Sequence, residues 1–435
     1  MKPVNIGLLG LGTVGGGTAT VLQDNAAEIS RRLGREVRIS AVCDLSEEKA
    51  KQICPNAAFI KDPFELVQHQ DVEIVVELFG GTGIAKDAVL KAIENGKHIV
   101  TANKKLLAEY GNEIFPLAEE KNVMVQFEAA VAGGIPIIKA LREGLAANQI
   151  RSIAGIINGT SNFILTEMRE KGSAFADVLK EAQALGYAEA DPTFDIEGHD
   201  AGHKITIMSA LAFGTPMNFS ACYLEGISKL DSRDIKYAEE FGYRIKLLGI
   251  TRKTDKGIEL RVHPTLIPES RLLANVNGVM NAVRVNADMV GETLYYGAGA
   301  GALPTASAVV ADIIDIARLI EAETDHRVPH LAFQPSQVQA QNILPMDEIT
   351  SSYYLRVQAT DEPGTLGQIA ALLAKENVSI EALIQKGVIN QSTAEIVILT
   401  HTTVEHNIKR AIAAIEALSC VDAPITMIRM ESLHD

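Results

Sequence analysis

The chain of 435 residues carries a formal net charge of −15 at pH 7, and 47% of its residues are hydrophobic. This length predicts two or three domains. The negative charge argues against a nucleic acid or an anionic membrane as partner, because both attract basic surfaces. No apolar run approaches the roughly 20 residues that cross a bilayer. The N-terminus lacks the pattern of a signal peptide, so we expect a protein that is neither inserted nor exported.

Four cysteines are scattered along the chain: Cys43, Cys54, Cys222 and Cys420. They form no CxxC pair, and the sequence shows no histidines at metal-ligand spacing. We interpret the cysteines as reduced, mostly buried thiols. This pattern predicts a cytoplasmic protein.

In residues 1–130, short apolar runs alternate with helical patterns. The runs are VNIGLLG, VRISAVCD, VEIVVEL, KHIVTAN and VMVQFEA. Strands that alternate with amphipathic helices form a parallel sheet with helices on both faces. Residues 1–130 are therefore predicted to form an α/β domain of the doubly wound, Rossmann type.

Three glycines, Gly10, Gly12 and Gly15, have the spacing G-x-G-x-x-G directly after the first strand and at the start of a helix. In this context Gly10 allows the turn, Gly12 lets a pyrophosphate approach the backbone, and Gly15 lets the helix pack on the sheet. The motif predicts a nicotinamide or flavin cofactor. A glycine-rich turn without a ligand is the alternative.

Asp44 ends the second strand, where an acidic side chain binds the ribose 2′-hydroxyl of NAD and repels the 2′-phosphate of NADP. No arginine follows Asp44 directly, which favours NAD. NADP stays open, because basic residues stand elsewhere in the same unit: Arg31, Arg32, Arg35 and Lys49.

The fourth strand ends in TANKK, and the carboxyl ends of parallel strands face the ligand crevice. Lys104 or Lys105 is thus a candidate to face a substrate, with a surface lysine pair as the alternative. The next strand runs through Glu128 into AAVAGGIP. One carboxylate and inward-turned carbonyl groups there form a candidate site for a monovalent cation, although a tight turn between domains explains the same residues.

Residues 131–303 mix strand-like segments with long helices, which predicts an α+β domain. A strong helical pattern follows in LPTASAVVADIIDIARLIE, and we assign about residues 304–325 to the first domain. Residues 326–350 form the expected linker. In residues 351–435, the order strand, helix, strand, strand, helix, strand predicts the βαββαβ arrangement.

The stretch EADPTFDIEGHDAGHK, residues 189–204, holds five carboxylates and ends in Lys204. By itself, such a run is typical of a solvated face. Asp200 and Lys204, however, are four residues apart and therefore share one face of a helix.

Several segments occur in the order and relative spacing of homoserine dehydrogenase: GLLGLGTVG, TANKKLLA, EAAVAGGIPII, AGIINGTSNFILTEM, GYAEADPTFDIEGHDAGHK and GAGAGALPTASAVVADI. The resemblance covers residues 4–320, and the runs Gly155–Met168 and Gly186–Lys204 are highly specific to that family. The tail, with LRVQATDEPGTLGQIAALLAKENVSI, resembles an ACT domain, a regulatory module of amino-acid biosynthetic enzymes. The whole arrangement is similar to the longer bacterial form of the family.

The resemblance implies an NAD(P)-dependent oxidoreductase that interconverts L-homoserine and L-aspartate 4-semialdehyde in threonine, methionine and isoleucine biosynthesis. It implies proton transfer by Lys204, beside Asp200, with Lys104 near substrate and nicotinamide. The implied substrate-binding residues are Gly159, Thr160, Tyr187, Glu189 and Asp195. The expected cofactor contacts are Gly10, Gly12, Thr13, Val14, Gly15, Asp44, Thr82, Lys104 and Gly301. Where family members bind sodium, this chain has Glu128 and the backbones of Val131, Gly133 and Ile135, so we expect sodium or potassium there.

An amino-acid substrate explains the acidic run. The substrate ammonium needs carboxylate acceptors, and Glu189 is the best candidate. The other end of the substrate needs a proton given or taken as hydride moves, and our hypothesis is that Lys204, oriented by Asp200, supplies it during aldehyde reduction. His199 and His203 on the same turn are the competitors. Neighbouring carboxylates raise the pKa of a lysine and burial lowers it, so the sequence leaves the resting protonation of Lys204 open.

Two other functions were weighed. A semialdehyde dehydrogenase needs a cysteine nucleophile with a nearby base, and the surroundings of Cys222 in NFSACYLEG show no such arrangement. A catalytically silent amino-acid-binding regulatory protein with the same fold is the second alternative. The presence of Glu189, Asp200 and Lys204 disfavours it.

In the tail, Asp361, Pro363 and Gly364 lie between the first strand and the first helix, where backbone N–H groups hold a ligand carboxylate. The resemblance implies threonine as the ligand and feedback inhibitor, bound at an interface between paired ACT units. A purely structural dimerisation module is the alternative. We expect a homodimer or a homotetramer.

Overall fold

A computed structural model describes residues 2–323, 326–390 and 393–433. The expected domain boundaries at residues 325 and 435 lie outside these ranges. The chain divides into two compact units. Unit 1 holds Met1–Gly159, Asp200–Cys222 and Val279–Gln341, and unit 2 holds Thr160–His199, Tyr223–Gly278 and Asn342–Asp435. Among the described helices, none combines the length and apolarity that a membrane crossing needs.

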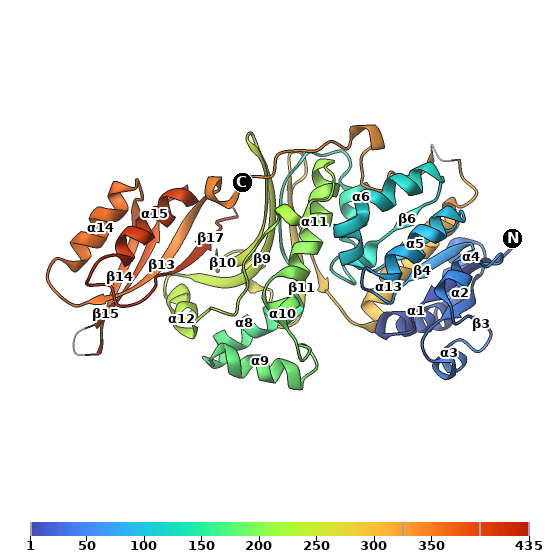
Figure 1. Ribbon diagram of the computed structural model, residues 1–435, viewed down its shortest axis with the longest axis horizontal. Coiled ribbons are helices and arrows are strands. Elements are labelled where there is room, and N and C mark those ends of the chain that lie inside the picture. The colour runs from blue at the N-terminus through green and yellow to red at the C-terminus, as the bar shows by residue number, and fades with distance from the viewer. Residues whose placement is uncertain (1, 324–325, 391–392, 434–435) are drawn as a thin grey trace. The chain divides into compact units, whose positions relative to one another are not determined.

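Unit 1 contains a parallel sheet with the strand order β3-β2-β1-β4-β5-β6, surrounded by helices (Figure 1). The strands are β1 (Val4–Leu9), β2 (Val37–Cys43), β3 (Ala58–Phe59), β4 (Ile74–Glu77), β5 (His98–Thr101) and β6 (Val125–Gln126). The helices are α1 (Thr13–Asp24), α2 (Ala26–Leu33), α3 (Glu47–Ile53), α4 (Pro63–Gln68), α5 (Ile84–Glu94) and α6 (Lys104–Glu120). This strand order is that of the dinucleotide-binding fold, so the predicted Rossmann-type sheet is confirmed.

Helix α13 (Ala302–Leu319) packs on this sheet after a long excursion of the chain. Its residues Val309, Ile313 and Ile316 are buried in the same core as β1 and β4. A Cβ added to Gly17 of α1 would lie 2.6 Å from the carbonyl oxygen of Ala302, so α1 and α13 touch at the level of their backbones.

The remainder of unit 1 contains an antiparallel ladder in the order β12-β11-β7. The elements here are η1 (Glu128–Ala130), α7 (Ile137–Lys139), η2 (Ala140–Gly144), β7 (Ile150–Ile156), α11 (His199–Phe213), η3 (Phe219–Ala221), β11 (Met280–Ala287) and β12 (Gly291–Ala298). Helix α11 is buried at every residue from Asp200 onward. Along this stretch the helix therefore has no solvated face, and its buried residues include the charged pair Asp200 and Lys204.

Unit 2 is built on strands in the order β9-β10-β17-β13-β15-β14. The remaining elements are α8 (Gly159–Lys171), α9 (Phe175–Ala184), α10 (Thr193–Ile196), β8 (Tyr223–Leu224), α12 (Ser232–Glu240), β9 (Tyr243–Thr254), β10 (Gly257–Pro268), η4 (Leu272–Asn275), η6 (Pro335–Gln337), η7 (Met346–Glu348), β13 (Thr350–Thr360), α14 (Thr365–Lys375), β14 (Ile380–Asn390), β15 (Thr393–Thr400), β16 (Thr403–Val404), α15 (Glu405–Glu416) and β17 (Thr426–Met430). Two parts of this list belong to unit 1: η6 and the first residue of α8. The order β13, α14, β14, β15, α15, β17 confirms the predicted βαββαβ domain. Helices α14 and α15 share one hydrophobic core with alternate residues of β13.

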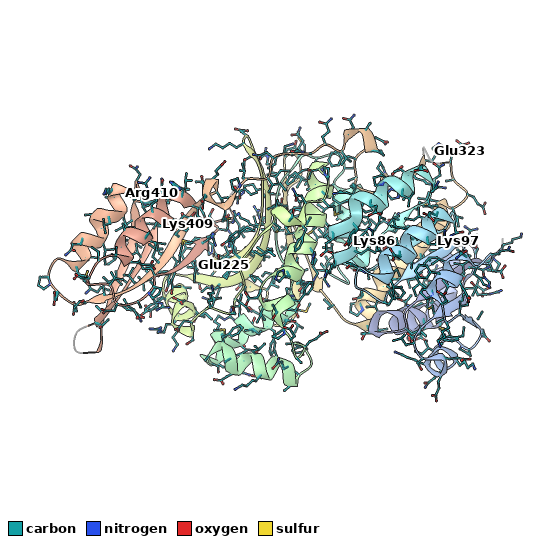
Figure 2. The ribbon with its side chains drawn as sticks, viewed as in Figure 1. Lys86, Lys97, Glu225, Glu323, Lys409 and Arg410 are labelled. Carbon is teal, nitrogen blue, oxygen red and sulfur yellow. The ribbon has the colours of Figure 1, made fainter. Side chains whose placement is uncertain are left out.

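Buried ion pairs join the βαββαβ domain to the rest of unit 2. Arg356 of β13 contacts Asp234 of α12 at 2.6 Å. Arg429 of β17 contacts Glu225 after β8 at 2.6 Å, and Glu225 is labelled in Figure 2. Arg261 of β10 is fully buried and lies 2.6 Å from Glu431. Strand β17 also pairs in parallel with β10, so the domain continues the sheet of its neighbour.

Candidate active site

Asp200 and Lys204 lie one turn apart on α11. Lys204 Nζ donates to Asp200 Oδ2 at 2.7 Å and to the carbonyl oxygen of Ile157, just after β7, at 2.7 Å. Asp200 and Lys204 are only 4% and 8% exposed. The helical spacing read from the sequence therefore places a lysine against a carboxylate in a buried environment.

Two further residues of unit 1 reach the same carboxylate. Lys104, the first residue of α6, places its Nζ 3.0 Å from Asp200 Oδ1. Asn158 donates from Nδ2 to Asp200 Oδ2 at 2.9 Å. Lys105, in contrast, is exposed and lies 4.0 Å from Glu109. Of the two candidate lysines, Lys104 is thus the one that contacts Asp200.

The charge of Asp200 follows from its neighbours. Burial by itself would raise the pKa of this carboxyl. The ammonium groups of Lys104 and Lys204, together with hydrogen bonds from Lys204 and Asn158, outweigh burial and hold the pKa of Asp200 well below its usual range. Asp200 is therefore an anion at neutral pH and favours the ammonium form of both lysines.

A buried hydrogen-bond chain fixes the start of α6. Glu77, at the end of β4, accepts from Thr101 Oγ1 at 2.6 Å, and Thr101 in turn accepts from the backbone N–H of Asn103 at 3.0 Å. Asn103 caps α6 and donates to the carbonyl oxygen of Gly81 at 2.7 Å. We did not predict a role for Glu77, Thr101 or Asn103 from the sequence. The available signal was that polar residues end two adjacent parallel strands.

The glycine loop has the geometry that a pyrophosphate requires. Gly10 has a φ of 97°, and a Cβ added to Gly15 would lie 2.0 Å from the carbonyl oxygen of Gly10. A Cβ added to Gly12 would meet no heavy atom within 4 Å, so the backbone is open to a ligand there. Thr13 and Val14 begin α1 directly after this loop, where N–H groups point outward. These residues fit a dinucleotide.

The other expected cofactor contacts lie at turns of unit 1. Thr82 stands in the β4–α5 connection, after Gly80 and Gly81 with φ values of 71° and 75°. Gly301, with a φ of 123°, precedes the first turn of α13. Asp44 accepts backbone N–H bonds from Leu11 of the glycine loop at 2.7 Å and from Ser46 at 3.0 Å.

Glu128 is buried and caps a short helix. Its two carboxylate oxygens accept the backbone N–H groups of Ile138 and Lys139, each at 2.8 Å. Burial raises its pKa, and these hydrogen bonds offset part of the effect. Within the described ranges, no hydrogen bond ends on the carbonyl oxygens of Val131 or Gly133. In sequence these carbonyl groups follow Glu128 closely, and carboxylate and carbonyl oxygens are the usual ligands of an oxygen-ligated cation. Ile135, the fourth expected ligand, donates its N–H to the carbonyl oxygen of Ala132 at 3.0 Å.

The expected substrate-binding residues of unit 2 form a group of their own. Thr160 Oγ1 donates to the carbonyl oxygen of Tyr187 at 2.7 Å, and the Tyr187 ring packs edge-on against Phe163 at 5.0 Å. Ser161 Oγ donates to the carbonyl oxygen of Asp195 at 3.0 Å. The first turn of α8 is thus bonded to the acidic segment 187–195. Glu189 is exposed in this segment.

The two competing histidines point elsewhere. The His203 ring is buried and stacks on Phe219 with ring centroids 4.0 Å apart, and its Nε2 lies 3.6 Å from Glu109. The His199 ring stacks beside Phe194 at 6.3 Å. Both rings make aromatic contacts, whereas Lys204 contacts Asp200 directly.

Cys222 is unsuited to nucleophilic catalysis. It is buried, and burial raises the pKa of its thiol to about 12. A nucleophilic cysteine needs a lowered pKa so that the thiolate forms near neutral pH. This environment argues against an acyl-enzyme mechanism.

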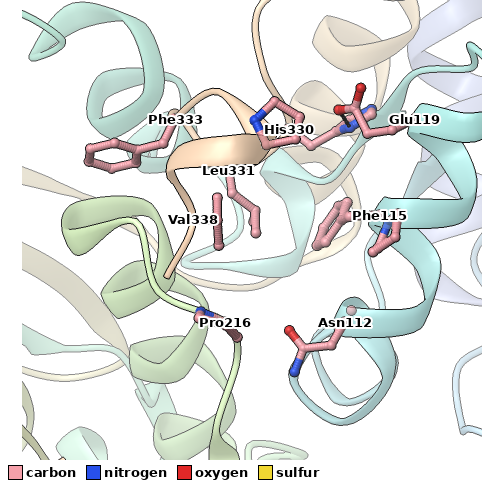
Figure 3. A pocket seen from close by; sticks show the side chains of 11 residues that line it. Asn112, Phe115, Glu119, Pro216, His330, Leu331, Phe333 and Val338 are labelled. Atoms are coloured by element: carbon pink, nitrogen blue, oxygen red, sulfur yellow. Dashed lines mark hydrogen bonds and ion pairs between the residues drawn. The ribbon is translucent and has the colours of Figure 1, made fainter. Parts of the chain in front are cut away.

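A separate pocket of about 440 Å³ lies between α6 and residues 330–338 (Figure 3). Phe115, Leu331 and Phe333 give it an apolar lining. Its histidine is held internally, because His330 Nδ1 lies 2.7 Å from Glu119 and Nε2 accepts the Val125 N–H at 3.0 Å. None of the site residues predicted from the sequence lines this pocket.

Comparison with known proteins identifies the family. The family model "Homoserine dehydrogenase" matches residues 136–314, its NAD-binding domain matches residues 10–128, and the ACT domain matches residues 353–420. The homoserine dehydrogenase of Neisseria gonorrhoeae is 90% identical over 435 residues, with 100% of both chains covered. The chain belongs to the homoserine dehydrogenase family. The homoserine dehydrogenase of Pseudomonas aeruginosa is 56% identical over 437 residues, again with 100% of both chains covered. A crystal structure of the homoserine dehydrogenase from Thiobacillus denitrificans is 60% identical, has a TM-score of 0.96 and covers 100% of this chain and 99% of that chain.

Homoserine dehydrogenase is the function that the sequence analysis predicted, and it is confirmed together with the ACT domain and a nicotinamide cofactor. The enzyme is an oxidoreductase of amino-acid biosynthesis with a small-molecule substrate. The catalytically silent sensor is not supported, since full-length relatives with this activity are so similar.

Proposed function

We propose that Lys204 is the proton-transferring residue of this homoserine dehydrogenase, that Asp200 orients it, and that Lys104 completes the charged cluster. The observation that carries this proposal is one buried carboxylate in contact with two lysines, at 2.7 Å and 3.0 Å. Burying several charged groups costs free energy, and such clusters concentrate at functional sites, which supports a catalytic role for this one.

The chemistry of the cluster follows from charge. When bound, a nicotinamide would accept the hydride in the oxidation of homoserine or supply it in the reduction of the semialdehyde. In reduction, the carbonyl oxygen becomes negative, and Lys204 donates a proton from Nζ to that oxygen. In oxidation, Lys204 takes the hydroxyl proton. Asp200 holds Lys204 in one orientation in both directions, and Lys104 adds positive charge beside the developing oxyanion.

We assign the recognition of the substrate's amino-acid end to the segment 187–195 and the first turn of α8. The exposed carboxylate of Glu189 is the acceptor for the substrate ammonium, with Asp195 and Tyr187 beside it. Gly159 and Thr160 place backbone groups near the substrate. The bonds Thr160 to Tyr187 and Ser161 to Asp195 support this, because they fix the two segments to each other.

The remaining assignments rest on single features. We assign Asp44 to the ribose 2′-hydroxyl, which favours NAD over NADP, and Thr82 and Gly301 to further cofactor contacts. We assign sodium or potassium to Glu128 with the backbones of Val131, Gly133 and Ile135, to be tested by turnover in single-cation buffers.

The free cysteines among the described residues support a cytoplasmic location, testable by fractionation. Strand β12 ends its ladder with Tyr296 exposed, which supports a homodimer or homotetramer, to be measured by light scattering.

For the ACT domain we propose threonine as the feedback inhibitor. Asp361, Pro363 and Gly364 form the exposed β13–α14 connection, and Gly364 has a φ of 98° at the start of α14. Such a turn aims helix N–H groups at a ligand carboxylate. A threonine titration of turnover measures this binding.

The proposed catalytic role is tested with a matched set of lysine variants. Lys204→Ala is expected to lower kcat by about 100- to 10,000-fold, the usual effect of removing a general acid. The kcat of Lys104→Ala is expected to lie between those of Lys204→Ala and the wild type. Lys105→Ala is the control, since Lys105 is exposed and contacts only Glu109 in the described structure. Near-normal turnover by folded Lys204→Ala enzyme would refute the assignment.

A further inference from the structure

Lys246 is a buried lysine of β9 that the proposed mechanism does not use. It is 1% exposed. Its Nζ donates to the carbonyl oxygen of Val276 at 2.6 Å and to the side-chain oxygens of Asn162 and Asn277, each at 3.2 Å. All three acceptors are neutral. Glu170, an acid that influences the pKa of Lys246, pairs with Arg169 instead.

The charges around Lys246 do not favour an ammonium group. Burial lowers the pKa of Lys246 most, and Arg169 of α8 and Arg244 of β9 lower it further, whereas Glu170 of α8 raises it. The result is a pKa of about 7. A buried lysine on neutral acceptors lowers the stability of the fold compared with an apolar residue of the same size. Its presence therefore needs a reason other than stability.

The partner of Lys246 supplies that reason. Asn162 lies in the first turn of α8, three residues after Gly159. Its Nδ2 donates to the carbonyl oxygens of Val276 and Gly278, at 3.1 Å and 2.9 Å, while its Oδ1 accepts from Lys246. Lys246 and Asn162 thus tie the turn 276–278 to the start of α8.

A second contact shows how little room the start of α8 has. A Cβ added to Gly159 would lie 2.8 Å from the carbonyl oxygen of Val279, directly after the turn 276–278. Gly278 also donates its N–H to Thr166 Oγ1 at 3.0 Å. Any shift of this turn therefore moves the backbone that carries Gly159 and Thr160.

We propose that Lys246 is a positioning residue for the dehydrogenase reaction, which acts through Asn162 and the turn 276–278 to hold the first turn of α8 in the conformation that receives the substrate. This inference rests on the proposed placement of the substrate at Gly159 and Thr160. With Lys246 removed, Asn162 Oδ1 and the Val276 carbonyl group lose the hydrogen bond that Lys246 Nζ donates to each of them.

The test compares Lys246→Met, Asn162→Ala and the double variant, with Lys253→Met as control, because Lys253 is an exposed lysine of the same strand. Lys246→Met is expected to lower kcat/KM for homoserine by about 10- to 100-fold, because the hydrogen bonds to Asn162 and Val276 are lost. The double variant is expected to be no worse than Asn162→Ala, since the two residues act in series. Wild-type kinetics for Lys246→Met, or additive losses in the double variant, would overturn the proposal.

Stability separates positioning from misfolding. The folded-state pKa of Lys246 is lowered, so the wild type gains stability as pH rises from about 7 toward the unfolded value of about 10.4. Lys246→Met is expected to unfold at a higher urea concentration than wild type at pH 7, and this advantage should shrink at pH 9. If Lys246→Met does not fold, Lys246→Gln takes its place in the same measurements. If Asn162→Ala itself leaves kcat/KM unchanged, Lys246 does not act through Asn162 and the proposal fails, whereas the role of Lys204 is judged by Lys204→Ala alone.

Discussion

Asp200 is the residue on which the active site depends, because its two oxygens contact different lysines. Oδ1 lies 3.0 Å from Lys104, and Oδ2 lies 2.7 Å from Lys204. The pKa of Asp200 is lowered, so its ionised form contributes stability above the unfolded pKa of about 3.9. That contribution is lost as pH falls through the lower folded-state pKa. The same carboxylate therefore supports both the chemistry and the fold at neutral pH.

Asp200→Asn is expected to lower kcat by at least about 100-fold while keeping the shape of the side chain. In homoserine oxidation Lys204 must first lose its proton, so activity rises with pH. Removal of the negative charge disfavours the ammonium form and is expected to move this rise to lower pH. The measurement is the pH profile of kcat. Asp191→Asn, at an exposed carboxylate of the same acidic run, serves as the control, and an unchanged midpoint for Asp200→Asn would contradict the proposed pairing.

At the scale of secondary-structure elements, the β2–α3 connection holds Asp44, and the proposed preference for NAD rests on this residue. Asp44 is bonded to Leu11 and Ser46, and although burial opposes ionisation, these hydrogen bonds and Lys49 lower its pKa. Asp44→Asn keeps a hydrogen-bonding side chain and removes the charge that repels a 2′-phosphate. We expect the ratio of kcat/KM with NADP to kcat/KM with NAD to rise about tenfold or more.

The control for Asp44 is Glu47→Gln, which removes a carboxylate from the next helix, where Glu47 pairs with exposed Lys51. Both variants change the net charge by the same amount. If the two variants changed the cofactor ratio equally, the effect would come from overall charge, and Asp44 would have no specific role.

Periodicity predicted most strands and helices, because each is a local pattern of apolar residues. One exception was short: β3 spans only Ala58–Phe59, too few residues for any pattern. Another was long: the stretch RDIKYAEEFGYRIKLLG has a helical pattern, yet α12 ends at Glu240 and the strand β9 begins at Tyr243. The burial of charged residues was less predictable. Arg261 is typical of a surface in sequence, yet it is buried because Glu431, 170 residues away, pairs with it. Of the candidate site, Asp200 and Lys204 were visible from their spacing, whereas Asn158 and Glu77 were not, since their partners lie far along the chain.

Across the whole molecule, the ACT domain is joined to the rest of unit 2 by backbone as well as by charge. Thr265 of β10 lies beside Arg429 of β17 on one side and beside Lys246 of β9 on the other. One row of the sheet thus runs from the ACT domain to the lysine that holds α8. A ligand that changes the ACT strands acts on a sheet shared with that lysine.

Threonine is expected to lower turnover and to raise the unfolding temperature of the wild type, as a ligand of the folded state does. Gly364→Ala is expected to weaken the inhibition by about tenfold or more, because a φ of 98° strains any residue with a Cβ. Gly367→Ala is the matched control, since it lies within α14 with open space around it. The measurement is inhibition of turnover over a threonine series. Equal inhibition of both variants would remove the β13–α14 connection from the proposed binding site.

The late position of α13 in the sequence affects when the nucleotide-binding sheet can fold during synthesis. Val309, Ile313 and Ile316 complete the core of the nucleotide-binding sheet, whose strands all lie before residue 127. A ribosome releases the chain from its N-terminus, and domains generally fold as they emerge. Here the strands of this sheet must wait for a helix that ends at Leu319, after β7, β11 and β12 have already been synthesised. The sheet therefore cannot complete its core until the whole stretch from the end of β6 at Gln126 to Leu319 has been translated.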